Sequence, residues 1–176
     1  MKIALGKLDE GRVILDELLE NLPLDAPFSY VIIDIALAYG EMNLVFYQPE
    51  NLFEGLEERV QPYREAGFGY LLADEFWLRG RVALALGQYN AARESLLKAK
   101  GAAEAQDERA ILWKILVTLS EVEKASGNVD LADNLCEQAR EMVNDIAEHA
   151  GEMRDVFLNQ PAVVQLLAGT NHSSTS

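Results

Sequence analysis

Cysteine is almost absent from this sequence, which has Cys136 alone among its 176 residues. A single cysteine excludes an internal disulfide and gives no indication of a secreted, disulfide-held domain. Long apolar runs are also missing. The most apolar stretch, residues 31–39, is interrupted by Asp34 and is far shorter than the roughly 18 residues of a membrane span. The sequence therefore predicts a cytoplasmic protein with no membrane partner.

Basic residues are scarce as well, with 15 Lys and Arg against 29 Asp and Glu and a net charge of −14. Affinity for nucleic acid comes mainly from cations that meet phosphates, so a nucleic-acid partner is not expected. Residues 13–58 contain no Lys or Arg, although carboxylates recur throughout them. A solvated acidic face that keeps the protein soluble is the simpler interpretation. The alternative is a docking surface for a basic partner.

The residues that carry catalysis are few. There is no glycine-rich nucleotide loop, and only two histidines are present, His149 and His172. His149 shares a predicted helix face with Asp145 and Glu152, which is too weak a ligand set for zinc. Cys136 has no suitably placed histidine and is interpreted as a small buried hydrophobic residue. We therefore predict no catalytic residue, cofactor or metal, and no enzyme activity.

The most informative stretch is residues 83–99, which reads as the turn of a helical hairpin. Gly87 suits a helix C-terminus because it adopts positive φ without a Cβ clash, and Asn90 suits the N-cap of the next helix. Similar turns centre on Gly6, Gly40, Gly87 and Gly127, separated by 34, 47 and 40 residues. At the last of these turns Asp130 is the predicted N-cap. The chain is thus expected to repeat one supersecondary unit.

Apolar spacing at helical periodicity places helices between these turns. We expect the fold to be all-α, a right-handed solenoid of helical hairpins over residues 1–169, followed by a polar tail at residues 170–176. Because the first helix resembles the second helix of a hairpin, the chain is expected to be a fragment that starts in mid-repeat. The predicted helices end near residues 21, 39 and 62 and then cover residues 71–86, 90–104, 108–126, 130–149, 152–159 and 161–167.

The residue types at repeated positions resemble the tetratricopeptide repeat, a helix-turn-helix unit of about 34 residues. Small residues lie where helices would cross closely, and larger apolar residues fill the gaps between hairpins. Arg79 and Ala83 depart from the pattern in one unit, and Ser120, Glu123 and Cys136 depart in the next. The matching residues are Phe76, Gly80, Tyr89, Ala92, Leu96 and Ala99, then Leu116, Leu119, Gly127, Ala132 and Ala139.

Residues 53–167 resemble a narrower group, the degenerate tetratricopeptide-like region at the C-terminal end of large bacterial signal-transduction ATPase regulators and ATPase-fused nucleotide cyclases. In that group the array often closes with an Arg, a Phe-Leu pair and a Pro before a short apolar helix. The ATPase, cyclase and DNA-binding parts have no counterpart in this sequence. The residues that carry the likeness are Arg154, Phe157, Leu158, Pro161, Val163, Val164, Leu166 and Leu167.

This resemblance implies a groove lined by the first helix of each hairpin. Trp77 follows Phe76, which fills the inward position, so Trp77 is expected to face the groove and to be more accessible than Phe76 or Leu116. The predicted groove residues are Tyr30, Asp34, Leu37, Asp74, Trp77, Arg81, Leu84, Lys114, Val117 and Glu121.

A non-catalytic protein–protein interaction module follows as the expected function, as the regulatory or sensory arm of a multidomain signalling protein with a protein or peptide partner. The alternative is a ligand-sensing domain that binds a peptide or small effector in the groove. The Lys-and-Asn arrangement that holds a peptide C-terminal carboxylate in some tetratricopeptide proteins is absent. Self-association is expected through the apolar face of the first helix, at residues 13–22.

Overall fold

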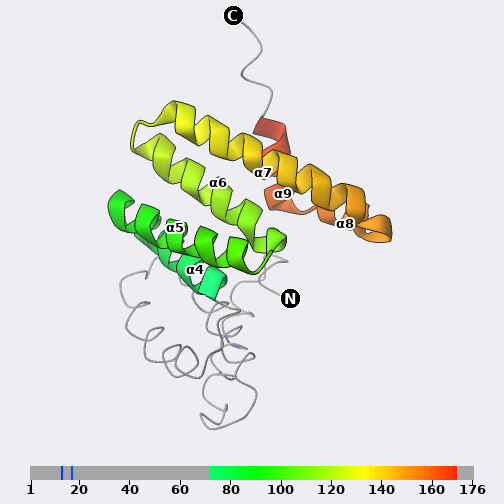
Figure 1. Cartoon of the computed structure of the whole chain (residues 1–176), viewed down its shortest axis with the longest axis horizontal. Helices are drawn as coiled ribbons and strands as arrows, with labels where there is room; N and C mark the ends of the chain where they lie inside the picture. Colours follow the sequence, from blue (N-terminus) through cyan, green and yellow to red (C-terminus); the bar gives the residue numbers. More distant parts are fainter. Residues whose placement is uncertain (1–12, 14–16, 18–71, 170–176) are drawn as a thin grey trace, which may run out of the picture.

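A computed structural model of the chain describes residues 72–169 together with Val13 and Glu17. Within these residues every regular element is helical, and four longer helices are followed by three short ones (Figure 1). The elements are α4 (Leu72–Ala85), α5 (Tyr89–Ala105), α6 (Arg109–Ala125), α7 (Val129–His149), the 3₁₀ helix η3 (Gly151–Met153), α8 (Arg154–Leu158) and α9 (Pro161–Ala168).

The predicted all-α class is confirmed for the described residues, and the predicted bounds agree to within two residues at each end of the longer helices. Pro161 opens the last helix as predicted, because the first helical position needs no backbone N–H. The earlier helices, the acidic stretch, the start in mid-repeat and the polar tail lie outside the described residues. Of the first helix only Val13 and Glu17 are described, and both are helical and exposed.

Three turns with the same backbone geometry connect the four long helices. Each has one residue in the left-handed region: Gly87 at φ 70°, Asp107 at φ 54° and Gly127 at φ 86°. After it, the next N–H bonds back to a carbonyl five residues earlier, as from Gln88 to Ala83 at 2.8 Å and from Asn128 to Glu123 at 2.9 Å. This is the Schellman motif, which satisfies the last carbonyls of a helix. The expectation for Gly87 and Gly127 is confirmed, and Asp107 takes the same role without being glycine.

The predicted N-caps, Asn90 and Asp130, are wrong by two residues. The helices begin at Tyr89 and Val129, with Gln88 and Asn128 at the N-cap and no side-chain cap bond. The Schellman turn feeds directly into the next helix, because the carbonyl of Gln88 already accepts the N–H of Ala92 at 2.9 Å. A backbone turn therefore replaces the side-chain cap that the sequence suggested.

Consecutive long helices pack side by side, α4 on α5, α5 on α6 and α6 on α7 (Figure 1). Gly80 shows why small residues lie at the crossings, since a Cβ there would lie 2.4 Å from Cγ of Leu96. Alanines at the corresponding crossings are fully or almost fully buried. They are Ala92, Ala99, Ala132 and Ala139.

The C-terminal helices lie against α7. Val163 and Leu166 of α9 are buried in the same core cluster as Val143 of α7. Arg140 of α7 donates from Nε to the backbone carbonyl of Leu166 at 3.2 Å, which caps the end of α9. The short final helix thus covers an apolar surface that α7 would otherwise expose.

Cys136 departs from its predicted role as a buried hydrophobic residue. It is half-buried, and its Sγ lies 3.0 Å from Oγ of Ser120, which itself donates to the carbonyl of Val117. Ser120 takes the position where the repeat pattern has glycine, and Cys136 takes the position where it has an aromatic residue. The two side chains meet each other across the α6–α7 contact.

Candidate functional site

Seven of the ten predicted groove residues lie within the described helices, on one side of α4 and α6. We call this surface the α4–α6 face. All are half-buried except Glu121, which is exposed. Tyr30, Asp34 and Leu37 lie outside the described residues. The members of the face are Asp74, Trp77, Arg81 and Leu84 from α4, and Lys114, Val117 and Glu121 from α6.

Trp77 is the centre of this face and joins the two helices. Its indole Nε1–H donates to Oγ1 of Thr118 at 2.9 Å, and Thr118 donates in turn to the carbonyl of Lys114 at 3.0 Å. The Thr118 bond runs one helical turn back, a common geometry for a threonine within a helix. These bonds hold the indole in one orientation between α4 and α6.

Two cations lie over the Trp77 ring. The Arg81 guanidinium is 4.7 Å from the ring centroid, and the Lys114 ammonium is 5.7 Å from it. Lys114 is also 5.9 Å from the ring of Trp113. Cations at such distances are attracted by the negative face of an indole, with about 0.5–1 kcal/mol at exposed sites and more where water is excluded. The face therefore holds a compact cation–aromatic cluster.

The carboxylates on either side of this cluster are in unequal environments. Although Glu121 as a whole is exposed, desolvation of its carboxyl group raises its pKa, and the nearby Arg81 charge partly opposes this effect. Burial also raises the pKa of Glu108, and the charge of Asp74 raises it further. The α4–α6 face thus carries negative charge near the N-terminal ends of both helices and cations beside Trp77.

Sequence reasoning missed two members of this site. Thr118 and Glu108 were not predicted, although Thr118 lies four residues after Lys114 and therefore on the same helix face. The second tryptophan, Trp113 in the first turns of α6, is not part of this face, since it is only 2% exposed in the core. Trp77 is less buried than Leu116 as expected, whereas Trp77 and Phe76 are both half-buried.

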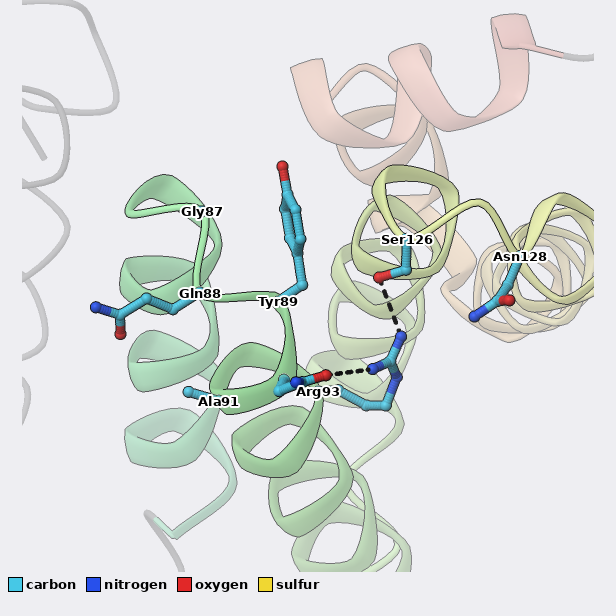
Figure 2. Close-up of a pocket in the computed structure, with 8 residues that line it drawn as sticks. Gly87, Gln88, Tyr89, Ala91, Arg93, Ser126 and Asn128 are labelled. Carbon is cyan, nitrogen blue, oxygen red and sulfur yellow. Dashed lines mark hydrogen bonds between the residues drawn. The ribbon is translucent and has the colours of Figure 1, made fainter.

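A separate pocket of about 720 Å³ lies between the α4–α5 turn and the α6–α7 turn. Figure 2 shows the Tyr89 ring standing between the two turns and Arg93 reaching across towards Ser126. Amide and hydroxyl side chains and the Tyr89 ring contribute to the lining, which was not predicted from the sequence. The lining residues are Gly87, Gln88, Tyr89, Asn90, Ala91, Arg93, Ser126 and Asn128.

The floor of this turn pocket is held by an ion pair between α5 and α6. Arg93 donates from Nε to Oε1 of Glu123 at 2.5 Å and from Nη2 to Oε2 at 2.9 Å, a two-pronged geometry. Asn128 donates to the same carboxylate at 2.6 Å, and Ser126 accepts from Arg93 at 3.1 Å. The hydrogen bonds from Arg93 lower the pKa of Glu123, so this carboxylate stays ionised.

A second, smaller depression of about 380 Å³ lies between α5, α6 and α7. Arg109 and Asp145 form an ion pair in its lining. Asp145 also interacts with His149 through its carbonyl, which lies 2.8 Å from Nδ1. Across the part of the chain that the structure describes, no group of three or more His, Cys, Asp and Glu side chains could hold a metal ion.

Comparisons with protein-family models, with curated proteins and with solved structures found no match. Among residues 72–169, no helix combines the length and the apolar character that crossing a membrane requires. The functional argument therefore depends on the geometry of the α4–α6 face and the turn pocket.

Proposed function

We propose that this chain is a non-catalytic protein-interaction module that binds a protein or peptide through the α4–α6 face. In this proposal the hairpins belong to a tetratricopeptide-like solenoid that serves as the regulatory arm of a cytoplasmic signalling protein. The gathering of Trp77, Arg81 and Lys114 on one half-buried face carries the proposal. Trp and Arg dominate the few residues that supply most binding energy in protein interfaces.

The packing of the face supports this interpretation, because a useful anchor must be rigid before the partner arrives. Trp77 is tied to Thr118 and stacked with Arg81, so little conformational freedom remains for a partner to remove. The helices themselves are anchored by the core on their other side, where Leu116 and Ile115 are buried.

Peptide display on the full chain tests the proposal directly. A library of random dodecapeptides selected on the wild-type protein is re-screened on Trp77→Ala and on Tyr89→Ala. We expect the enriched peptides to bind Trp77→Ala about thirtyfold more weakly, which corresponds to the hot-spot scale of about 2 kcal/mol. Binding to Tyr89→Ala, an exposed aromatic at the turn pocket, should be unchanged.

The folding of the variants separates a binding role from a structural one. Urea unfolding of Trp77→Ala should show a loss smaller than the roughly 3–5 kcal/mol expected for a core Trp. A larger loss, with none for Phe76→Ala, would mean that Trp77 is a core residue and that the predicted groove residues are wrong as a set.

A second candidate function is the sensing of a small ligand in the turn pocket. The pocket is widely open to solvent, and its volume of about 720 Å³ lies within the range of about 300–1,000 Å³ that is usual for small-molecule sites. Its lining offers amide and hydroxyl groups for hydrogen bonds, together with one aromatic ring, Tyr89. This location differs from the groove that the sequence suggested for such a ligand.

Thermal shift against a panel of metabolites distinguishes this second function. A ligand that binds only the folded state raises the melting temperature. A compound that acts at the turn pocket should lose its effect on Tyr89→Ala and keep it on Trp77→Ala, the reverse of the pattern expected for a peptide on the α4–α6 face.

A further inference from the structure

Lys114 is unusual among the cations of the described helices. Most others are paired with carboxylates, as in Arg79–Glu75, Arg93–Glu123 and Arg109–Asp145. Within the described residues Lys114 makes no ion pair, and its ammonium contacts are the rings of Trp77 and Trp113. A half-buried cation that lacks a carboxylate, in a chain with 29 Asp and Glu, offers an open position for an anion.

Glu108 has the complementary character at the N-terminal end of α6. Its Oε2 atom is buried and accepts no hydrogen bond within the described residues. Glu108 also lies close enough to Asp74 for the two charges to disfavour each other. A carboxylate oxygen in this situation is stabilised by an incoming donor, and most strongly by a charged one.

The spacing of these two positions defines what can reach both. Glu108 and Lys114 both face α4, since Glu108 lies near Asp74 and Lys114 lies over Trp77. Six residues separate them, which corresponds to about 9 Å along a helix axis. An extended peptide advances about 3.3 Å per residue and its side chains alternate, so side chains two residues apart leave the same side about 7 Å from each other. Flexible Lys and Glu side chains widen this span to the required distance. Arg81 and Glu121 lie near each other and offset each other's charge. Glu108 and Lys114 are therefore the two charged positions of this face that can attract a partner.

We propose that the α4–α6 face binds an extended peptide segment with a basic and an acidic side chain two residues apart, the basic one at Glu108 and the acidic one at Lys114 beside Trp77. The inference rests on the proposed interaction function and specifies its partner. A purely acidic segment would be repelled by the net charge of −14. A purely basic segment would place a cation beside the Lys114 ammonium, and the two like charges would repel each other.

Capped tripeptides test this directly on the full ¹⁵N-labelled chain. The probes are Lys-Ala-Glu, Lys-Ala-Lys, Glu-Ala-Glu and Gln-Ala-Gln, titrated to millimolar concentration. The readout is the indole N–H resonance of Trp77, assigned with Trp77→Phe, while the buried Trp113 is the internal control. We expect Lys-Ala-Glu to bind about threefold more tightly than either single-sign peptide, the scale of one partly exposed ion pair.

Charge-reversal variants provide a readout that a merely structural role would not change. Lys114→Glu should transfer the preference to Lys-Ala-Lys, and Glu108→Lys should transfer it to Glu-Ala-Glu. Lys114→Gln and Glu108→Gln are milder variants for use if a reversal unfolds the chain, and each should abolish the preference at its own position. Equal binding of all four peptides, or reversals that leave the preference unchanged, would overturn the inference.

The selection of displayed peptides distinguishes a failure of the proposed peptide segment from a failure of the proposed interaction function. Peptides that depend on Trp77 but show no charge pattern would refute the bipolar segment and leave the interaction function standing. If no selected peptide depends on Trp77, both the segment and the function of this face are refuted.

Discussion

At the scale of single residues, Glu123 is the polar group most closely engaged by its neighbours. Its carboxylate is almost fully buried and receives bonds from Arg93 and Asn128. Hydrogen bonds to charged groups contribute about 1.5–3 kcal/mol, so Glu123→Gln should lower the free energy of unfolding by that amount at pH 7. Urea unfolding measures it. The exposed pair Glu94–Lys98 supplies the control, because solvent screens it and Glu94→Gln should leave the free energy of unfolding almost unchanged.

This contribution should depend on pH in a defined direction. Because Arg93 lowers the pKa of Glu123 in the folded state, the stabilisation is complete above the unfolded pKa of about 4.3. It is lost as the pH falls through the lower folded pKa. The difference between wild type and Glu123→Gln should therefore shrink below about pH 4. A difference that stays constant down to pH 2 would show that the side chain acts by packing alone.

Two glycines within helices should respond oppositely to the same substitution. A Cβ at Gly80 would lie 2.4 Å from Leu96, so Gly80→Ala should destabilise the protein by about 1–3 kcal/mol through overpacking. No atom lies within 4 Å of a Cβ at Gly101, so Gly101→Ala should stabilise α5 by about 0.5–1 kcal/mol. Thermal unfolding of both variants checks the signs, and equal signs would refute the close crossing of α4 and α5.

At the scale of elements, the α5–α6 turn differs from its two neighbours in one residue. Gly87, Asp107 and Gly127 are spaced twenty residues apart and share positive φ, yet only Asp107 has a side chain. A left-handed conformation costs most L-residues roughly 1 kcal/mol, and less for Asp. Asp107→Gly should thus stabilise the protein by up to about 1 kcal/mol, and Gly127→Asp should destabilise it similarly. Calorimetry on both variants provides the test, and destabilisation by Asp107→Gly would contradict the shared geometry.

Helix positions could be predicted where local chemistry decides them. Gly87 and Gly127 mark turns because few other residues adopt positive φ, and Pro161 marks a helix start for a similar local reason. The N-caps at Asn90 and Asp130 could not be predicted in this way, because the Schellman turn satisfies the backbone before the side chain is needed. The preference of glycine for positive φ predicts where each turn lies, whereas the backbone hydrogen bonds of the turn determine where the next helix begins.

The candidate site was predictable to the extent that helical periodicity fixes which residues share a face. Trp77, Arg81 and Lys114 were identified from their spacing, and they meet in the structure. The Thr118 bond and the buried oxygen of Glu108 depend on how α4 packs against α6. The spacing of residues within one helix carries no information on that packing. The turn pocket was missed for the same reason, since its two walls belong to different hairpins.

At the scale of the whole molecule, α9 acts as the cover of one end of the helical array. An amphipathic helix such as α7 is stable when its apolar side is buried against a neighbour. Val163 and Leu166 bury their side chains in the core cluster, and Arg140 of α7 holds the end of α9. The outer side of this cover still exposes Val164, so its capping is incomplete.

Removal of residues 161–176 should therefore destabilise the remaining helices. Fully burying a Val or Leu side chain contributes about 1.5–3 kcal/mol, so loss of Val163 and Leu166 should cost about 3–6 kcal/mol. The uncovered surface of α7 should also promote self-association, which sedimentation velocity detects. A chain that stops after Gly169 keeps α9 and is the matched control. A monomeric truncated chain with an unchanged melting temperature would show that α7 needs no cover, because its own contacts with α6 would then be sufficient.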